Sequence, residues 1–268
     1  HGVLPNKITF DATGILIDEN HVKFFHEKEI SKLDWKTLDI DFVIESTGKF
    51  KTYELAHQHI DSGAKRVVLS APPEDDIIKT VVLGVNESIL DGTELIVSNA
   101  SCTTNNAAPM IKIIKELCGI EQAFVTTVHS YTTDQSLHDQ PHKDLRRARS
   151  AAQSIIPTTT GAAKALTKIF PEYKGKIGGG GIRVPVPDGS LTDITCYVTK
   201  QVTEAEINHA FKKAAENELK GILDYTTDPI VSVDIQGNTN SCLFDAQLTS
   251  CLDKMVKVVG WYDNEIGY

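Results

Sequence analysis

One cysteine stands where its thiol could act as a nucleophile. Cys102 lies in residues 98–105 (SNASCTTN), directly after the apolar segment 94–97 and before a predicted helix at 106–117. A thiol at a helix start faces unpaired backbone N–H groups and the positive end of the helix dipole, and both favour the thiolate. The thiolate is the reactive form, so we interpret Cys102 as a nucleophile; a buried structural thiol is the alternative.

A histidine follows a second apolar strand. Residues 125–128 (VTTV) are predicted to be extended, and His129 comes directly after them. A neutral imidazole can take a proton from a thiol, and an imidazolium can pair with a thiolate. The two residues therefore predict a cysteine-dependent enzyme with a Cys102–His129 pair. An ordinary core or surface histidine is the alternative for His129.

The composition argues against several classes of function. The net charge of −9 is opposite to that of a nucleic-acid-binding surface. No uninterrupted apolar run is long enough to predict a membrane span. The five cysteines form an odd set without a C-x-x-C motif, which argues against a disulfide framework and against a zinc site. We expect a cytoplasmic protein that binds no metal, no nucleic acid and no membrane.

The first hundred residues alternate apolar strands with helical segments. The predicted strands are residues 40–44, 65–70, 80–83 and 95–97, and residues 53–62 predict an amphipathic helix that ends at Gly63. This alternation is typical of a parallel, doubly wound sheet. Such sheets bind ligands outside the carboxyl ends of their strands, which here carry residues 46–48, 70–72 and 98–100.

The second half of the chain is richer in strands. After a long polar segment at 130–154 and a helix that starts near Gly161, strands are predicted at 182–186, 191–199, 230–235, 241–248 and 255–262. A helix at 203–219 interrupts them and begins with a capping box at Thr203. Strands with few helical crossovers predict an α+β region with a mainly antiparallel sheet.

Five motifs occur in the order found in phosphorylating glyceraldehyde-3-phosphate dehydrogenases, and the chain resembles this family from His1-Gly2 to Gly267-Tyr268. The motifs are residues 98–105 (SNASCTTN), 129–132 (HSYT), 160–165 (TGAAKA), 183–185 (RVP) and 261–265 (WYDNE). The resemblance implies an α/β fold, in which a partial doubly wound (Rossmann-type) parallel sheet precedes an α+β catalytic domain. It implies a truncated NAD-binding domain at 1–101 and a catalytic domain at 102–265, with residues 266–268 starting the return to the NAD-binding domain.

The chain departs from the family pattern at both ends and at one internal position. It lacks the G-x-G-x-x-G turn and the acidic residue that open the family's cofactor domain, and the glycines at 178–181 lie in the wrong half. It stops at Tyr268, where the family continues into a helix, so we expect a central fragment of a longer protein. Asn106 replaces a second cysteine usual in the family, with little expected effect on catalysis.

The resemblance implies the oxidative phosphorylation of D-glyceraldehyde 3-phosphate to 1,3-bisphosphoglycerate with NAD, a step of glycolysis. The Cys102 thiolate would attack the aldehyde to give a thiohemiacetal, hydride transfer to NAD would leave a thioester, and inorganic phosphate would release the acyl phosphate. His129 would activate the thiol and then donate a hydrogen bond to the developing oxyanion. The implied partners are the aldehyde, inorganic phosphate and further copies of the chain in a homotetramer.

Phosphate-bearing substrates need hydroxyls, N–H groups at helix starts, and arginines. The resemblance assigns the phosphate of the aldehyde to Thr132 and Arg183, with Asp134 expected to orient Arg183. It assigns the attacking phosphate to Ser101, Thr103, Arg147, Thr160 and Gly161. A plain helix cap is the alternative for residues 158–161, and a solvated basic face is the alternative for Arg146, Arg147 and Arg149.

The resemblance assigns two residues to the cofactor. They are Ser70, at the end of a predicted strand, and Asn264, whose amide would hold the nicotinamide carboxamide; Thr133 and Tyr268 lie near them in the family. A plain turn is the alternative for Asn264. Pro141, in the long polar segment, favours NAD over NADP.

Three other functions stay open. Erythrose-4-phosphate dehydrogenase shares the cysteine motif and residues 183–185, and turnover with each aldehyde would separate the two enzymes. A Cys–His thiol hydrolase would pass the thioester to water and would need no nicotinamide. A non-catalytic binding protein would show no preferential reaction of Cys102 with iodoacetamide near neutral pH.

Overall fold

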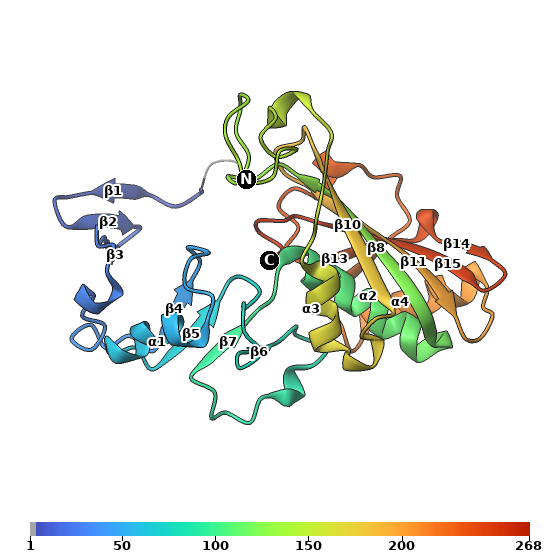
Figure 1. Cartoon of the computed structure of the whole chain (residues 1–268), viewed down its shortest axis with the longest axis horizontal. Helices are drawn as coiled ribbons and strands as arrows, with labels where there is room; N and C mark the ends of the chain where they lie inside the picture. Colours follow the sequence, from blue (N-terminus) through green and yellow to red (C-terminus); the bar gives the residue numbers. More distant parts are fainter. Residues whose placement is uncertain (1–3) are drawn as a thin grey trace.

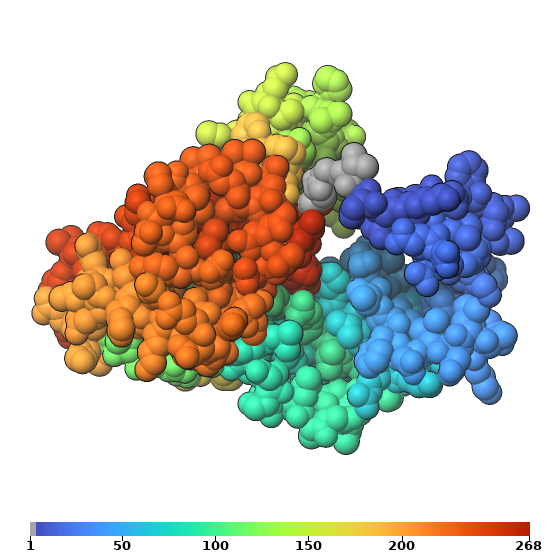
Figure 2. All heavy atoms as spheres, turned by 180° about the vertical axis from the view of Figure 1, so that it is seen from behind, coloured from blue at the N-terminus to red at the C-terminus, as the bar shows by residue number. Residues whose placement is uncertain are grey.

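The computed structural model describes residues 4–268, so His1 and Gly2 of the predicted match lie outside the described residues. The chain forms two lobes. The elements from β1 to β6 lie at one end of the molecule and those from α2 onward at the other, and the view from behind shows the same division (Figures 1 and 2).

The described part of the chain begins with a small antiparallel sheet that the sequence patterns did not predict. Its strands are β1 (Ile8–Phe10), β2 (Gly14–Ile17) and β3 (Asn20–Lys23), in the order β1-β2-β3. The side chains of β1 and β3 are exposed. The burial signal that reveals a strand in a sequence is therefore weak here.

A four-stranded parallel sheet forms the rest of the first lobe, as predicted. Its strands β4 (Phe42–Glu45), β5 (Arg66–Leu69), β6 (Lys79–Thr80) and β7 (Ile96–Ser98) lie in the order β4-β5-β7-β6. Helix α1 (Tyr53–Asp61) connects β4 to β5 and begins at the cap Thr52, whose side chain accepts a hydrogen bond from the Leu55 N–H. It packs on one face of the sheet, while Phe42 and Ile44 on β4 are 61% and 70% exposed.

Helix α2 (Cys102–Cys118) links the lobes and starts four residues before the predicted helix. Ser101 caps it, since its side chain accepts a hydrogen bond from the Thr104 N–H. The helix ends at Gly119, whose φ of +69° suits glycine. Cys102 is therefore the first residue of the helix.

A mixed, mainly antiparallel sheet forms the second lobe (Figure 1). Its strands are β8 (Ile120–Ser130), β9 (Ile156–Thr158), β10 (Ile177–Val184), β11 (Ser190–Val198), β12 (Leu223–Thr226), β13 (Cys242–Asp245), β14 (Ser250–Leu252) and β15 (Met255–Tyr262). The order is β12-β13-β15-β11-β8-β10-β9, with β14 beside β15; β10 is parallel to β8, and β12 is parallel to β13.

Helices α2, α3 (Ala162–Ile169) and α4 (Glu204–Glu216) enclose the main core with this sheet. The predicted capping box of α4 is present, because Thr203 and Glu206 exchange hydrogen bonds. Apolar side chains of α2, such as Met110 and Ile114, are fully buried in this core. The core therefore holds α2, and with it Cys102, against the sheet.

Three strand predictions in this lobe differ from the structure. The strand predicted at 241–248 ends at Asp245, and Ala246–Leu248 forms a 3-10 helix. Residues 230–235 do not form a strand: Ser232–Ile235 is a short 3-10 helix, in which the Asp234 carboxylate accepts a hydrogen bond from the Val231 N–H at 2.7 Å. Strand β10 begins at Ile177 rather than at Ile182, so the glycines 178–181 lie inside a strand. A Cβ built on Gly179 would lie 2.8 Å from the Val125 carbonyl oxygen, which explains why glycine fits here.

None of the helices within residues 4–268 combines the length and the apolar character that crossing a bilayer requires.

The glycine requirement of β10 can be tested by substitution. We expect Gly179→Ala to lower the free energy of unfolding by about 1–3 kcal/mol, because the new methyl group would press on the neighbouring strand. The matched control is Gly180→Ala, since nothing lies within 4 Å of a Cβ at that position. Urea denaturation of both variants measures the difference, and equal losses would contradict the close-approach explanation.

Candidate active site

The thiol of Cys102 and the imidazole of His129 face each other. Cys102 is the first residue of α2, and His129 lies one residue before the end of β8. The distance from the Cys102 Sγ to the His129 Nε2 is 3.4 Å. The structure thus brings together the two residues that the sequence nominates for nucleophile and base.

Burial decides the charge state of this pair. Burial, followed by the positive charge of Arg183, lowers the pKa of His129 to about 4, so the imidazole is neutral near pH 7. Burial also raises the pKa of the Cys102 thiol, although the Thr103 N–H and the charge of Arg183 act in the opposite direction. Desolvation therefore acts against the local preference of a helix start for the thiolate.

Two contacts of the His129 Nδ1 favour opposite tautomers, because a carbonyl oxygen needs a hydrogen on Nδ1, whereas a guanidinium group donates to an Nδ1 that carries none. Nδ1 lies 2.8 Å from the Ser130 carbonyl oxygen, and the Arg183 Nη1 contacts Nδ1 and donates to the same oxygen at 2.8 Å. When Nδ1 carries the hydrogen and donates to that oxygen, Nε2 presents a lone pair to the thiol. This tautomer suits a general base.

A buried tyrosine hydroxyl fixes the floor of the site. The Tyr262 hydroxyl lies 2.9 Å from the Thr103 Oγ1 and 2.8 Å from the Thr127 Oγ1. The Tyr262 ring also meets the His129 ring edge-on, with centroids 5.8 Å apart. These contacts join the start of α2 to β8 and β15, which keeps the thiol and the imidazole in register.

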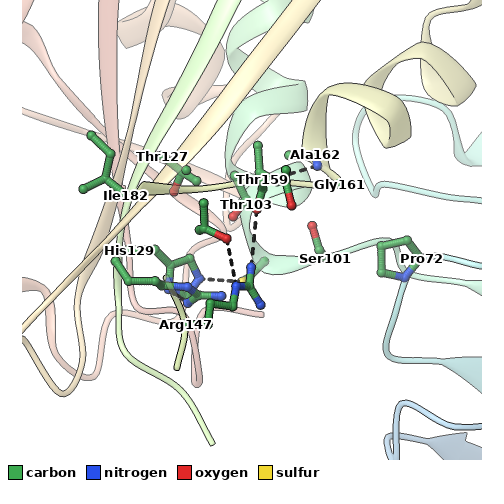
Figure 3. Close-up of a pocket in the computed structure, with 15 residues that line it drawn as sticks. Pro72, Ser101, Thr103, Thr127, His129, Arg147, Thr159, Gly161, Ala162 and Ile182 are labelled. Atoms are coloured by element: carbon green, nitrogen blue, oxygen red, sulfur yellow. Dashed lines mark hydrogen bonds between the residues drawn. The ribbon is translucent and has the colours of Figure 1, made fainter. Parts of the chain in front are cut away.

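A cavity of about 250 Å³ opens beside the Cys102–His129 pair (Figure 3). The predicted phosphate ligands that line it are Ser101, Thr103, Arg147, Thr160, Gly161 and Arg183. Hydroxyls, two guanidinium groups and the start of α3 converge on this space, which suits phosphate groups. Thr132 is not among the lining residues; it lies in a turn in which its carbonyl oxygen accepts from the Gln135 N–H at 2.9 Å.

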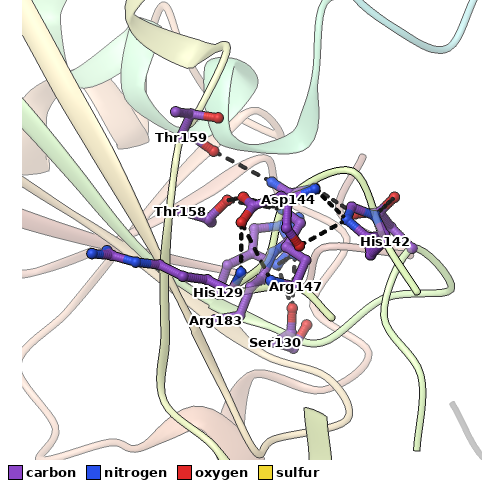
Figure 4. Close-up of polar contacts among 10 residues, drawn as sticks. His129, Ser130, His142, Asp144, Arg147, Thr158, Thr159 and Arg183 are labelled. Carbon is purple, nitrogen blue, oxygen red and sulfur yellow. Dashed lines mark hydrogen bonds and ion pairs between the residues drawn. The ribbon is translucent and has the colours of Figure 1, made fainter. Parts of the chain in front are cut away.

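Arg147 is held at the edge of this cavity by several partners (Figure 4). Its Nε donates to the Thr158 Oγ1 at 2.8 Å, and its Nη1 forms an ion pair with Asp134. Although burial opposes ionisation, Arg147 holds the pKa of Asp134 below its ordinary value. The expectation that Asp134 orients Arg183 was wrong, because the fold brings Arg147 to this carboxylate instead.

The two predicted cofactor residues lie in separate surroundings. Ser70 lines a groove of about 480 Å³ on the parallel sheet, together with Ser98, Asn99 and Tyr268. The Asn264 Oδ1 accepts from the Ser130 Oγ and the Ser190 Oγ, both at 2.7 Å. This arrangement leaves the amide nitrogen of Asn264 as a donor of fixed orientation, which fits a carboxamide oxygen, while the groove offers hydroxyls to a polar ligand.

Sequence reasoning missed Thr127, Thr158 and Tyr262 as parts of the site. Thr127 has a local signal, because it lies two residues before His129 on β8 and therefore faces the same side of the sheet. Tyr262 belongs to a recognised motif, but its partner Thr103 lies 159 positions away. That contact depends on the fold.

Comparisons with known proteins give one consistent result. The family model described as "Glyceraldehyde 3-phosphate dehydrogenase, C-terminal domain" matches residues 101–264, and the NAD binding domain model of the same family matches residues 1–53. The chain is 52% identical to glyceraldehyde-3-phosphate dehydrogenase 2 of Streptomyces avermitilis, with 100% of the chain and 80% of the relative covered. It is 49% identical to the dehydrogenase of Mycolicibacterium smegmatis (100% and 79%) and 46% identical to dehydrogenase 1 of Bacillus subtilis (100% and 80%).

The lowered pKa of His129 predicts an acid-sensitive stability. The imidazole pKa drops from 6.5 to about 4 on folding, so the unfolded chain binds the proton more readily. Stability is therefore lost as the pH falls from the unfolded value towards the folded one, by at most about 3 kcal/mol.

We expect His129→Asn to lose less unfolding free energy than the parent between about pH 7 and about pH 4.5, measured with urea. His138→Asn, at an exposed position in the loop that follows β8, is the control. The same change in both variants would show that the effect does not arise in the site.

Proposed function

The chain belongs to the glyceraldehyde-3-phosphate dehydrogenase family, and on that premise we propose that Cys102 is its nucleophile and His129 its general base. The enzyme converts D-glyceraldehyde 3-phosphate to 1,3-bisphosphoglycerate with NAD and inorganic phosphate, through a thiohemiacetal and a thioester on cysteine. The observation that carries the assignment is the 3.4 Å contact between the Cys102 Sγ and the His129 Nε2.

The first step is proton transfer within the pair. A neutral imidazole takes the thiol proton as the sulfur attacks the aldehyde carbon. The imidazolium first donates a hydrogen bond to the oxygen that becomes negative and then gives it the proton, which forms the thiohemiacetal hydroxyl and returns the imidazole to its neutral form. Arg183 lowers the pKa of His129 in the free site. A substrate phosphate beside Arg183 offsets this positive charge and makes the imidazolium more favourable.

Oxidation follows at the thiohemiacetal carbon. NAD supplies the chemistry of this step by accepting a hydride. His129 takes the proton of the thiohemiacetal hydroxyl as the thioester forms, which balances the charge. Ser70, at the carboxyl edge of the parallel sheet, and Asn264, with its oriented amide nitrogen, are the proposed cofactor contacts.

The thioester is then cleaved by inorganic phosphate. An oxygen of the phosphate attacks the acyl carbon, the carbon–sulfur bond breaks, and Cys102 leaves as the thiolate. We assign the attacking phosphate to Ser101, Thr103, Arg147, Thr160 and Gly161. The phosphate of the aldehyde is assigned to Arg183 and Thr132; Arg183 lines the cavity, whereas Thr132 would have to reach it from the neighbouring turn.

We further propose a domain division and an assembly. The NAD-binding region would span 1–101 and the catalytic region 102–265, and residues 266–268 would start the return to the NAD-binding region. The boundary is supported by the parallel sheet, whose last strand in the sequence is β7 (Ile96–Ser98), just before α2. The proposed assembly is the homotetramer that the family resemblance implies. Association of copies is supported by three exposed residues that line one groove on the large sheet, Phe124, Tyr197 and Met255. We propose glycolysis in the cytoplasm as the setting, because glycolysis consumes D-glyceraldehyde 3-phosphate.

The other candidate functions gain no support. The relatives described above are all named glyceraldehyde-3-phosphate dehydrogenases. Neither erythrose-4-phosphate oxidation, nor thiol hydrolysis as the main activity, nor a purely non-catalytic role is favoured by any feature of the site.

Substitution of the pair tests the proposed roles. We expect Cys102→Ser to abolish measurable NADH formation, and His129→Asn to lower kcat by about 10²–10⁴-fold with little change in the KM for the aldehyde. Cys251→Ser, at a second partly exposed thiol, is the control and should keep parent activity. Full activity in Cys102→Ser would remove the proposed mechanism.

Substitution of Arg147 tests the phosphate assignment. We expect Arg147→Leu to raise the KM for inorganic phosphate by about tenfold or more, because charge-assisted hydrogen bonds to the anion are lost. The KM for the aldehyde should change much less. Arg146→Leu, at the exposed neighbouring position, is the control. A rise confined to the KM of the aldehyde would assign Arg147 to the other phosphate.

A further inference from the structure

Three side chains, two of them buried and one half-buried, form a hydrogen-bonded chain in the first lobe, away from the Cys102–His129 pair. The Trp35 indole nitrogen lies 3.1 Å from the His59 Nδ1, and the His59 Nε2 lies 3.1 Å from a carboxylate oxygen of Glu45. His59, on α1, and Glu45, at the end of β4, are each 4% exposed. No step of the proposed reaction uses these residues.

The direction of this chain is fixed by chemistry. An indole N–H can only donate, so the His59 Nδ1 must accept, and the hydrogen of the neutral ring must be on Nε2. That Nε2–H donates to the Glu45 carboxylate. Two aromatic rings enclose the imidazole, since the rings of Trp35 and Phe50 each have their centroid 6.2 Å from that of His59. The carboxylate is therefore held in one orientation.

The other carboxylate oxygen of Glu45 accepts hydrogen bonds from the loop that follows β4. It accepts from the Thr47 N–H at 2.8 Å and from the Thr47 hydroxyl. The next residue, Gly48, has a φ of +71°, so the chain turns sharply here. The Glu45 carbonyl oxygen also accepts from the Ser70 N–H at 3.0 Å, which ties this loop to the strand end that carries a proposed cofactor contact.

This loop lies where a cofactor is expected to bind. Residues 46–48 follow the carboxyl end of a parallel strand, and parallel sheets bind their ligands outside those ends. A buried carboxylate is costly unless its hydrogen bonds are satisfied, and here both oxygens are used. A fully satisfied polar chain makes its members rigid and specifies one arrangement.

We propose that Trp35, His59 and Glu45 are positioning residues that hold the loop at 46–48 and the Ser70 strand end in the geometry that binds NAD. The proposal rests on the NAD-dependent function described above. In this proposal, Trp35 contributes to the affinity for NAD without touching the reacting atoms. It acts through two hydrogen bonds, one from Trp35 to His59 and one from His59 to Glu45.

The experiment compares two replacements of His59 in the enzyme. His59→Leu removes both hydrogen bonds, whereas His59→Gln keeps an acceptor and a donor on one side chain. We expect His59→Leu to raise the Kd and the KM for NAD by about tenfold, which corresponds to the loss of one or two hydrogen bonds. We expect His59→Gln to raise them by less than about threefold, because it keeps an acceptor and a donor. The kcat and the KM for the aldehyde should stay near parent values.

Two readouts need no cofactor. Cleavage by trypsin after Lys49, the exposed residue that directly follows the loop at 46–48, should be faster in His59→Leu than in His59→Gln or the parent. Alkylation of Cys102 by iodoacetamide should proceed at the parent rate in all three proteins. If Cys102 of the parent did not react with iodoacetamide, that result would count against the proposed Cys102–His129 pair and not against the proposed role of Trp35, His59 and Glu45.

Two outcomes would overturn the proposal. One is a His59→Leu protein with parent affinity for NAD and parent resistance to trypsin. The other is a His59→Gln protein as weak as His59→Leu, since that result would mean that packing alone matters. Should His59→Leu fail to fold, Trp35→Phe replaces it, because it removes the indole N–H and keeps a ring; parent affinity for NAD in that variant would also overturn the proposal.

Discussion

The desolvation of one thiol and one imidazole is the constraint on which the site depends. Both Cys102 and His129 are pushed towards their neutral forms by burial, and the charge of Arg183 acts further on His129. Burial therefore favours an uncharged pair, in which charge develops as a proton passes from sulfur to nitrogen. A thiol that stays protonated until substrate arrives is protected from unwanted reactions, because the thiolate is the reactive form.

The two lobes supply different parts of this site. The second lobe holds Cys102 and His129 rigidly, because α2 is anchored in the main core and the Tyr262 hydroxyl links α2 to β8 and β15. The first lobe supplies polar strand ends, including Ser70, on a sheet that α1 packs from one face. In the proposed function, the anionic substrates meet the guanidinium groups of Arg147 and Arg183 in the second lobe. The chemistry is thus placed at the junction, where α2 begins.

Local signals predicted most of the elements and the types of the reacting residues. The parallel sheet, α1, α4 with its capping box, and the Cys102–His129 pair all follow from short-range patterns. Side-chain contacts outside regular helices and strands were harder to predict from the sequence. Asp134 was assigned to Arg183, whereas its ion-pair partner is Arg147 in the same loop, and the path of this loop follows no periodic sequence pattern. The exposed strands β1 and β3 and the glycine-rich start of β10 carry little hydrophobic periodicity, so they were missed or shortened.

The sequence by itself determined the chemistry available: a thiol at a helix start, an imidazole at a strand end, and a set of hydroxyls and arginines. These features depend on the type of each residue and on its neighbours within a few positions, and the sequence gives both directly. Only the tertiary structure decided the charge state of that chemistry. Burial and the approach of Arg183 depend on contacts between distant segments, and desolvation acts against the local preference of a helix start for the thiolate.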